Sequence, residues 1–404
     1  MLPAPNSAYS ILVVAGESSG EQHAARVIEE VQRQNPELRL QWFGSGGVEM
    51  ARRRVELLAE IDHLAAVGPL EALGKLGNYW KLYRRLLREV ALRQTDLALL
   101  VDFPEFNLRL ARRLKGLKIP VCYFIGPQIW AWRSSRVDWI RRYVDQMLVI
   151  FPFEESFYRQ RGVRARFVGN PFSQLWEPHR RQPRRADAEE ALIALLPGSR
   201  EKEVEQIFPV LLEAARHLSG RLPCRFWVCK APAISAADLS RVYHKWLGRG
   251  RARRGPLGEG PSESHGLRLE IRSEPALELL PRVDCAIIKS GTSTLQAMIL
   301  EVPFVMVYRF SGLSYQLLRP LVKTDTYCLA NLVAGKKIVP EFVQSQATGE
   351  GIADYLSQLL KTPGRLEEVK QNLRIASERL GKRKAYPETA RQMMNLLLKD
   401  DRST

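Results

Sequence analysis

Short apolar runs alternate along the chain with longer stretches in which apolar residues recur at every third or fourth position. The run at 191–196, ALIALL, is typical of a strand buried on both faces of a parallel sheet. Pro197 ends this run, and Val204, Ile207 and Leu211 then follow the spacing of a helix with one apolar face. We therefore expect a strand, a tight turn and a helix in that order.

The same alternation repeats on both sides of this segment. Buried strands are expected at residues 10–14, 38–43, 97–101, 120–125, 147–150, 191–196, 225–229, 267–272, 285–288 and 304–308. Strands that alternate with helices favour parallel sheets wound on both faces, which bind ligands at the carboxyl ends of their strands. The predicted fold class is α/β, with two doubly wound, Rossmann-like domains facing a cleft.

The length of 404 residues suits two domains of ordinary size. We expect an α/β domain at residues 1–176, a linker at 177–188, a second α/β domain at 189–350 and helices at 351–404. The linker is predicted because its segment is polar and carries arginine and proline. Residues 248–264 are rich in Gly, Arg, Pro and Ser, which predicts an exposed, mobile loop.

The formal net charge of +17 is the unusual feature of the composition, since 45% hydrophobic and 26% charged residues are ordinary for a globular protein. Such a charge attracts nucleic acid, anionic lipid or phosphorylated substrates. The basic residues stand in short clusters without a recognition helix, zinc finger or stacked-aromatic motif, so nucleic acid is the weaker interpretation. A GC-rich genome, which favours arginine, is an alternative without functional meaning.

The cysteines and the amino-terminal sequence point to the cytoplasm. The five cysteines are scattered, show no zinc-type pairing and are odd in number, which fits a reducing compartment. The apolar run at 9–15 is too short for a secretory signal, and no apolar stretch is long enough to span a membrane.

Two predicted turns have the chemistry of a diphosphate site. Residues 197–200, Pro-Gly-Ser-Arg, lie between a strand and a helix start, where free N–H groups and the helix dipole attract an anion, and Arg200 adds a guanidinium. Glu203 could then meet a sugar or ribose hydroxyl. The alternative is a plain turn with Ser199 as the N-cap. Residues 290–293, Ser-Gly-Thr-Ser, repeat the pattern, so a nucleotide diphosphate is expected.

Asp102 is the candidate catalytic residue, because it follows the strand at 97–101 where that strand would open into the cleft. The alternative is an N-cap with Glu105 as its capping-box partner. The loop after 10–14 carries G-x-x-x-G, which is not the dinucleotide fingerprint. The six histidines form no metal or nucleophile–base motif and no D-x-D pair occurs, so no metal is expected.

The segment from Gly68 to Leu92 combines leucines at helical spacing with basic residues. Such a helix can lie in a membrane interface. The alternative is a helix that packs its apolar stripe on the sheet, which we favour for at least its second half. The predicted membrane contacts are Leu70, Leu73, Leu76, Trp80, Arg84 and Arg85, with Lys75 and Lys81 also facing headgroups.

Taken together, these motifs resemble the lipid-A-disaccharide synthases, bacterial glycosyltransferases of the two-domain GT-B fold. The resemblance covers nearly the whole chain in order. It is carried by residues 16–20 (GESSG), 101–107 (VDFPEFN), 130–133 (WAWR), 196–200 (LPGSR), 290–292 (SGT), 322–324 (VKT), 331–335 (NLVAG) and 339–341 (VPE).

The resemblance implies transfer of diacylglucosamine from UDP to the 6'-hydroxyl of diacylglucosamine 1-phosphate, with inversion and without metal or cofactor. It also implies a cytoplasmic enzyme held peripherally at the inner membrane, with the acceptor on the first domain and the UDP-sugar on the second. Asp102 would be the base, and Arg200 would stabilise the leaving diphosphate. The implied UDP contacts are Gly198, Ser199, Arg200, Glu203, Ser290, Gly291, Thr292, Ser293, Gln296 and Asn331. The implied acceptor contacts are Gly16, Glu17, Ser18, Glu105, Asn107, Gln128 and Trp132.

The chain departs from the family pattern at four of these and neighbouring positions. The family usually has Ala at Ser18, Asp at Glu21, His at Asn170 and Glu at Gln296, where the carboxylate often binds the ribose. A glutamine holds a hydroxyl less strongly than a carboxylate does. Two other functions stay open: a GT-B enzyme acting on a soluble UDP-sugar, such as an epimerase, and an inactive membrane-binding relative.

Overall fold

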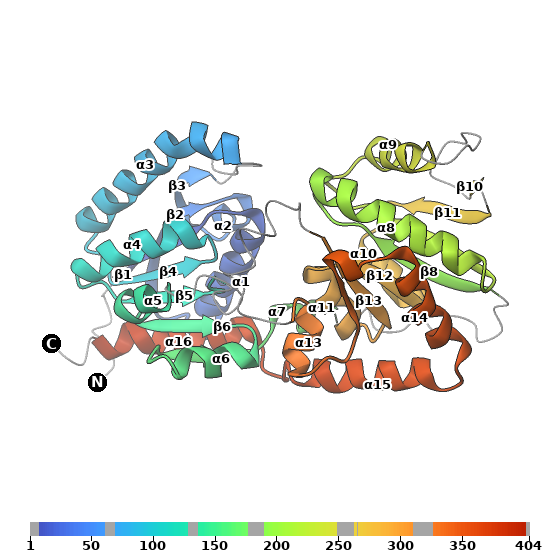
Figure 1. The fold of residues 1–404 in the computed structure, drawn as a ribbon. Helices are drawn as coiled ribbons and strands as arrows, with labels where there is room; N and C mark the ends of the chain where they lie inside the picture. The colour runs from blue at the N-terminus through green and yellow to red at the C-terminus, as the bar shows by residue number, and fades with distance from the viewer. Residues whose placement is uncertain are drawn as a thin grey trace. The chain divides into compact units, whose positions relative to one another are not determined.

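The computed structural model describes residues 8–60, 69–127, 136–176, 190–248, 262–264, 266–309 and 326–400. The chain divides into two compact units, each built on one sheet (Figure 1). The first unit is Met1–Pro171 together with Lys382–Thr404, and the second is Phe172–Gly381.

The first unit contains a parallel sheet in which the described strands follow the order β3-β2-β1-β4-β5-β6-β7. The chain order reverses between β1 and β4, where Ala15 lies opposite Val101. The strands are β1 (Ala8–Ala15), β2 (Arg39–Gly46), β3 (Glu56–Glu60), β4 (Leu97–Val101), β5 (Val121–Phe124), β6 (Gln146–Val149) and β7 (Ala165–Phe167).

Helices of the first unit pack in two groups. α3, α4 and α5 contact one another in sequence, and α1 contacts both α2 and α16. The helix α16 comes from the far end of the chain and lies beside α1 (Figure 1), where His23 Nδ1 is 2.9 Å from the Tyr386 hydroxyl. The helices are α1 (Ser18–Gln34), α2 (Val48–Ala51), α3 (Pro69–Leu92), α4 (Pro104–Gly116), α5 (Arg136–Tyr143), α6 (Pro152–Arg159) and α16 (Ala385–Asp400).

The second unit has a sheet of the same kind, in the order β10-β11-β9-β8-β12-β13-β14. β10 pairs antiparallel with β11, and the other pairs are parallel. The chain order reverses between β8 and β12. The strands are β8 (Ala191–Leu196), β9 (Cys224–Cys229), β10 (Ser262–Ser264), β11 (Leu267–Arg272), β12 (Cys285–Lys289), β13 (Phe304–Tyr308) and β14 (Glu341–Val343).

The longest helix of the second unit, α8, buries the predicted apolar face that contains Val204, Ile207 and Leu211. It packs against α14 so closely that a Cβ on Gly349 would lie 2.5 Å from Glu213 Cγ. The helices are α7 (Pro171–Trp176), α8 (Glu201–Ser219), α9 (Ala236–Leu247), α10 (Ala276–Leu279), α11 (Thr292–Ile299), α13 (Leu329–Ala334), α14 (Gly349–Lys361) and α15 (Arg365–Glu378), with the 3₁₀ turns η3 (Leu280–Arg282) and η5 (Gln344–Gln346).

The predicted α/β class with two doubly wound sheets is confirmed. The division of the chain differs from the expected boundaries at two places, one of which is the end of the first unit at Pro171 instead of residue 176. The segment 351–404, expected as one helical block, is shared between the units, because α14 and α15 belong to the second and α16 to the first. The expected linker at 177–188 lies outside the described residues, as does most of the expected loop at 248–264, which ends in the strand β10.

Candidate functional site

Several of the predicted site residues lie at the point in each sheet where the strand order reverses. In the first unit, Gly16 follows β1 and Asp102 follows the neighbouring strand β4. In the second, Pro197 follows β8 and Ser290 follows its neighbour β12. At such a switch point the adjacent loops diverge and leave room for a ligand at the carboxyl edge of the sheet.

Asp102 sits in a strained part of the backbone. Asp102 and Phe103 both have φ near +50°, the left-handed region that costs a residue with a side chain roughly 1–2 kcal/mol. The carbonyl of Asp102 accepts hydrogen bonds from the Tyr123 hydroxyl at 2.7 Å and from Asn107 Nδ2 at 2.8 Å, and these bonds hold the strained turn in place. The N-cap of α4 is Phe103. The alternative of Asp102 as the N-cap is therefore wrong.

The Asp102 carboxyl has the protonation behaviour of a base. Burial and then the nearby Glu17 carboxylate raise its pKa from 3.8 to about 6, against a hydrogen bond from the Phe103 N–H that lowers it. Above pH 6 the side chain is a carboxylate in a partly desolvated position. A raised pKa at a strand end is typical of catalytic carboxyl groups.

The loop after β1 fits closely against Phe103. A Cβ on Gly16 would lie 2.3 Å from the Phe103 ring, so only glycine fits at that position without moving the ring. The ring stacks on Phe106 at 5.1 Å and contacts Tyr79 of α3 at 5.7 Å between centroids. Glu17 and the neighbouring Ser18 are exposed and available to a ligand at this edge.

The remaining predicted acceptor residues have different surroundings. Asn107 is buried and uses its amide nitrogen to bind the carbonyls of Val101 and Asp102, so it positions the turn. Glu105 is exposed and forms an ion pair with Arg136. Gln128 and Trp132 lie outside the described residues.

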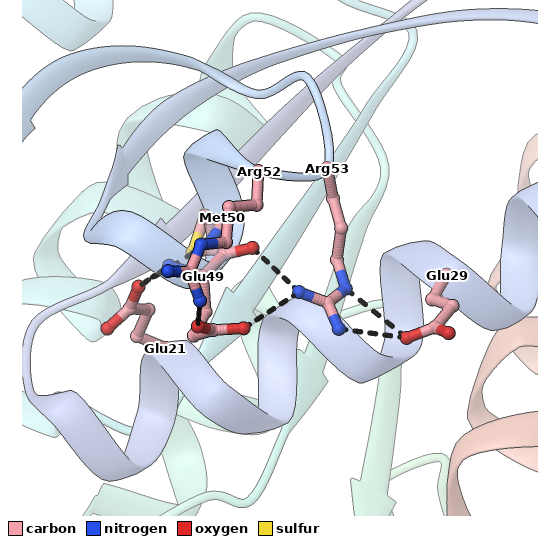
Figure 2. A network of polar contacts seen from close by, with 6 residues as sticks. All are labelled: Glu21, Glu29, Glu49, Met50, Arg52 and Arg53. Atoms are coloured by element: carbon pink, nitrogen blue, oxygen red, sulfur yellow. Dashed lines mark hydrogen bonds and ion pairs between the residues drawn. The ribbon is translucent and has the colours of Figure 1, made fainter.

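Two positions where the resemblance implies a different residue have structural partners, and Figure 2 shows those of the first, Glu21. Glu21 is buried and accepts hydrogen bonds from the N–H groups of Glu49 at 2.7 Å and Met50 at 3.4 Å, at the start of α2. Arg53 then links Glu49 to α1 through Glu29 at 2.9 Å. Asn170 is also buried and donates to the carbonyl of Ile150 at 3.1 Å.

A cavity of about 430 Å³ lies at the switch point of the second unit. Its described lining includes Leu196, Gly198, Ser199, Glu203, Cys229, Lys230, Ala231, Pro232, Ser273, Pro275, Ala276, Lys289, Ser290, Gly291, Thr292, Ser293 and Gln296. The two predicted diphosphate turns thus border one cavity. Arg200 is the N-cap of α8, and its side chain is 83% exposed beside the cavity. The alternative of Ser199 as the N-cap is wrong.

Glu203 is the hydrogen-bonding centre of this cavity. Its carboxylate accepts the Ser199 N–H at 3.1 Å and the Lys289 ammonium at 2.9 Å. Burial raises the pKa of Glu203, but the hydrogen bond and charge of Lys289, the Ser199 N–H and the charge of Arg200 together lower it below its ordinary value. Gly198 has a φ of +124°, and a Cβ there would lie 2.7 Å from the carboxylate.

Lys289 and Lys230 are cavity residues that the sequence analysis missed. The described lining contains two lysines and one carboxylate, that of Glu203, which Lys289 contacts. Each lysine stands at the carboxyl end of a strand, Lys289 as the last residue of β12 and Lys230 just after β9. That position was the signal available in the sequence, since loops at this edge of a parallel sheet line the ligand site.

Asn331 does not line the cavity. Its amide nitrogen donates to the Val339 carbonyl and to Glu341, and its amide oxygen accepts the N–H groups of Ile338 and Val339. Glu341 also accepts the N–H of Tyr327, whose carbonyl accepts the Ser290 hydroxyl at 2.9 Å. Asn331 therefore supports the loop behind Ser290, and contact between its amide and a nucleotide would require these bonds to break.

The predicted membrane segment is the helix α3. Trp80 is 60% exposed and stacks on Tyr83 at 5.6 Å, and Arg84 is exposed. Arg85 is exposed but also donates to the Leu58 carbonyl at 2.6 Å. The second half of α3 buries Leu82, Leu86 and Val90 against the sheet, as favoured from the sequence. The side chains of Leu70, Leu73 and Leu76 lie outside the description.

Two wider features are absent from the described residues. No helix in that part of the chain is both long and apolar enough to cross a membrane. No three His, Cys, Asp or Glu side chains among the same residues lie together as a metal site would require.

The chain is similar to known proteins over nearly its whole length. Residues 11–230 and 263–394 match the family described as lipid-A-disaccharide synthetase. A lipid-A-disaccharide synthase from Anaeromyxobacter dehalogenans (strain 2CP-C) is 39% identical over 402 residues, which are 98% of this chain and 100% of that protein. The lipid-A-disaccharide synthase of Myxococcus xanthus is 36% identical over 393 residues, 96% of this chain and 97% of that protein.

Solved structures share the fold at low sequence identity. A putative UDP-N-acetylglucosamine 2-epimerase from Listeria monocytogenes superposes with a TM-score of 0.59 at 11% identity and covers 98% of both chains. CalG4, the calicheamicin glycosyltransferase, gives a TM-score of 0.58 at 14% identity, over 98% of this chain and 99% of its own.

Proposed function

The chain belongs to the lipid-A-disaccharide synthase family, and from this premise we propose that it transfers 2,3-diacylglucosamine from its UDP carrier to the 6'-hydroxyl of 2,3-diacylglucosamine 1-phosphate. The products are the acylated disaccharide 1-phosphate and UDP. The observation that carries this proposal is the cavity in the second unit, where two turns suited to phosphate border one space lined by Lys230 and Lys289. A diphosphate is the ligand chemistry that such a site favours.

The donor binds in the second unit. Its diphosphate contacts the N–H groups of the turns 197–200 and 290–293 and the cations Arg200 and Lys289. The base and ribose take the rest of the cavity, against Ala231, Pro232 and Pro275 and within reach of Gln296. The first unit, with Gly16, Glu17, Ser18 and Asp102 at its switch point, binds the acceptor.

The reaction is a single displacement at the anomeric carbon, and it inverts the configuration there. Asp102 takes the proton of the acceptor hydroxyl while the hydroxyl oxygen attacks the anomeric carbon. The bond between that carbon and the β-phosphate oxygen breaks, and its electron pair leaves with UDP. Arg200, the helix N-termini and the lysines stabilise the negative charge that grows on the leaving diphosphate.

The acyl chains of both substrates lie in a membrane, and α3 is the element that brings the enzyme to it. Trp80 offers an exposed aromatic surface, and Lys81 and Arg84 are exposed beside it. An aromatic side chain among cations suits an interface with anionic lipid. We propose a cytoplasmic enzyme that attaches peripherally to the inner membrane.

The test is an assay of the purified full-length protein with the diacylated UDP-glucosamine donor and the acylated sugar phosphate acceptor in mixed micelles. The expected result is formation of disaccharide 1-phosphate and UDP in equal amounts. Turnover of soluble UDP-N-acetylglucosamine instead would identify an epimerase-like enzyme. Membrane binding without turnover of either donor would identify an inactive relative.

A further inference from the structure

Glu203 and Lys289 form a largely buried ion pair inside the cavity of the second unit. Lys289 Nζ lies 2.9 Å from Glu203 Oε1, and the two side chains are only 18% and 19% exposed. The other carboxylate oxygen accepts the Ser199 N–H at 3.1 Å. Lys289 also sits over the Tyr308 ring, 5.6 Å from its centroid.

The partners of the Glu203 carboxylate are the groups that a phosphate would use. They are a backbone N–H at the start of the long helix α8 and an ammonium at the end of β12. Arg200 Nη1 is 3.8 Å from the same carboxylate, which adds a third positive contribution. Gly198 gives the carboxylate its room, because a Cβ there would lie 2.7 Å from it. One internal anion thus lies where these groups converge.

We propose that Glu203 is an internal competitor for the donor's diphosphate, and that Lys289 exchanges its carboxylate partner for a phosphate when the donor binds. This inference rests on the proposed function, since it assigns the diphosphate to this cavity. Lys289 is then a phosphate-binding residue of the donor site, and Glu203 sets which anions can enter it.

The exchange explains how the site would select among anions. An incoming phosphate gains Lys289 and the Ser199 N–H only if Glu203 moves, and the displaced carboxylate needs new hydrogen-bond donors. A nucleotide supplies them as the hydroxyls of its ribose or sugar, whereas inorganic pyrophosphate supplies none. Pyrophosphate therefore bears the whole cost of displacement, and UDP bears only part of it. Discrimination by a cost imposed on the wrong ligand is a common basis of specificity.

The test compares the binding of UDP and inorganic pyrophosphate to the full-length protein by calorimetry. Glu203→Gln should bind pyrophosphate about tenfold more tightly than the wild type, because the internal anion is gone. Its affinity for UDP should rise less or fall, because the ribose loses its carboxylate partner. Lys289→Met, which keeps an unbranched side chain, should weaken the binding of both ligands about tenfold.

The matched control is Glu205→Gln, which removes one negative charge from an exposed position on the same helix without touching the cavity lining. The proposal is overturned if Glu203→Gln gains no more pyrophosphate affinity than this control. It is also overturned if Lys289→Met binds both ligands like the wild type, a result that decides the matter even if Glu203→Gln melts early. A wild type that binds pyrophosphate but not UDP would contradict the proposed function. The pyrophosphate affinities of Glu203→Gln and the wild type would still test the role of Glu203.

Discussion

Burial of Asp102 raises the pKa of its carboxyl group, which suits a catalytic base. The same burial lowers the stability of the folded protein when that carboxyl group is ionised. Its pKa in the folded protein is about 6, against an ordinary value of 3.8. The fold therefore holds the proton of Asp102 more tightly than the unfolded chain does. The stabilisation that this proton gives to the folded protein is complete below about pH 4 and is lost as the pH rises through 6. By pH 8 the free energy of unfolding is lower by on the order of 2–3 kcal/mol.

Asp102→Asn is expected to lower turnover roughly 10²–10⁴-fold, the usual share of a general base. It should also raise the free energy of unfolding at pH 8 and leave it nearly unchanged at pH 4, because the amide carries no charge to bury. Turnover of the wild type should rise as the pH passes through 6. Initial rates from pH 5 to 8 and thermal melts at pH 4 and 8 check these expectations. Near-normal turnover of the variant would exclude Asp102 as the base.

Arg200→Ala is expected to weaken UDP binding and to lower kcat, because the diphosphate gains negative charge as it leaves. Arg200→Lys should restore part of each, since an ammonium cannot form the two parallel hydrogen bonds of a guanidinium. The side chain is 83% exposed, so neither change should shift the melting temperature by more than a few degrees. Calorimetry with UDP and steady-state kinetics measure both effects. If Arg200→Ala binds UDP as tightly as the wild type, Arg200 does not bind the diphosphate.

At the scale of elements, the sequence predicts best where burial is complete. The runs at 97–101, 191–196 and 304–308 coincide with β4, β8 and β13, because these strands are apolar along their length. The strand β11 was also predicted at 267–272, where apolar residues alternate with charged ones. The short strands β3, β7, β10 and β14 were not predicted. All four stand at an edge of a sheet, and β3 and β14 carry mostly exposed or half-buried residues, so no apolar run marks them.

For the candidate site, the sequence predicted the position of the loops but not the partners of their side chains. Sequence position identifies the loops at the carboxyl edge of a sheet, and it correctly brought the turns 197–200 and 290–293 to one cavity. It does not show which polar side chains are already occupied within the protein. The side-chain amides of Asn331 and Asn107 form hydrogen bonds with nearby backbone groups. Lys289 forms an ion pair with Glu203, which is 86 residues away in the sequence. Only three-dimensional packing reveals those partners.

The helix α3 carries a prediction of its own. Trp80→Ser should reduce binding to vesicles that contain anionic lipid and raise the apparent KM for the membrane-held acceptor, because an exposed aromatic surface is lost. Leu92→Ser is the matched control, since Leu92 is 65% exposed at the far end of the same helix. Sedimentation with vesicles at low and high salt measures the binding. Equal losses in both variants would contradict a specific role for Trp80.

At the scale of the whole molecule, the chain passes from the first unit to the second and back again. The second unit is continuous, Phe172–Gly381, whereas the first is completed only by the segment that contains α16. There, His23 is kept neutral, since burial and then the charge of Arg26 lower its pKa from 6.5 to about 4, and it lies beside the Tyr386 hydroxyl. The first unit is therefore the one whose fold is completed by a separate segment from the far end of the chain.

Removal of residues 382–404 is expected to destabilise the first unit and to leave UDP binding by the second largely intact. The loss removes buried apolar side chains of α16, among them Tyr386, Ala390 and Met393, and exposes the face of α1 against which α16 packs. Burial of such apolar surface is worth about 25 cal/mol per Å². Calorimetric melting should show an earlier first transition, and titration with UDP should give a Kd within about threefold of the wild type. A single unshifted transition would contradict the prediction.

The return of α16 to the first unit has a consequence for synthesis on the ribosome. Because α16 follows the second unit in the chain, all of Phe172–Gly381 is translated before the first unit receives its last helix. During that interval the nascent first unit exposes an apolar face on α1, and domains that wait in this way are open to aggregation and chaperone binding. The second unit can therefore complete its fold first, although most of the first unit is made earlier.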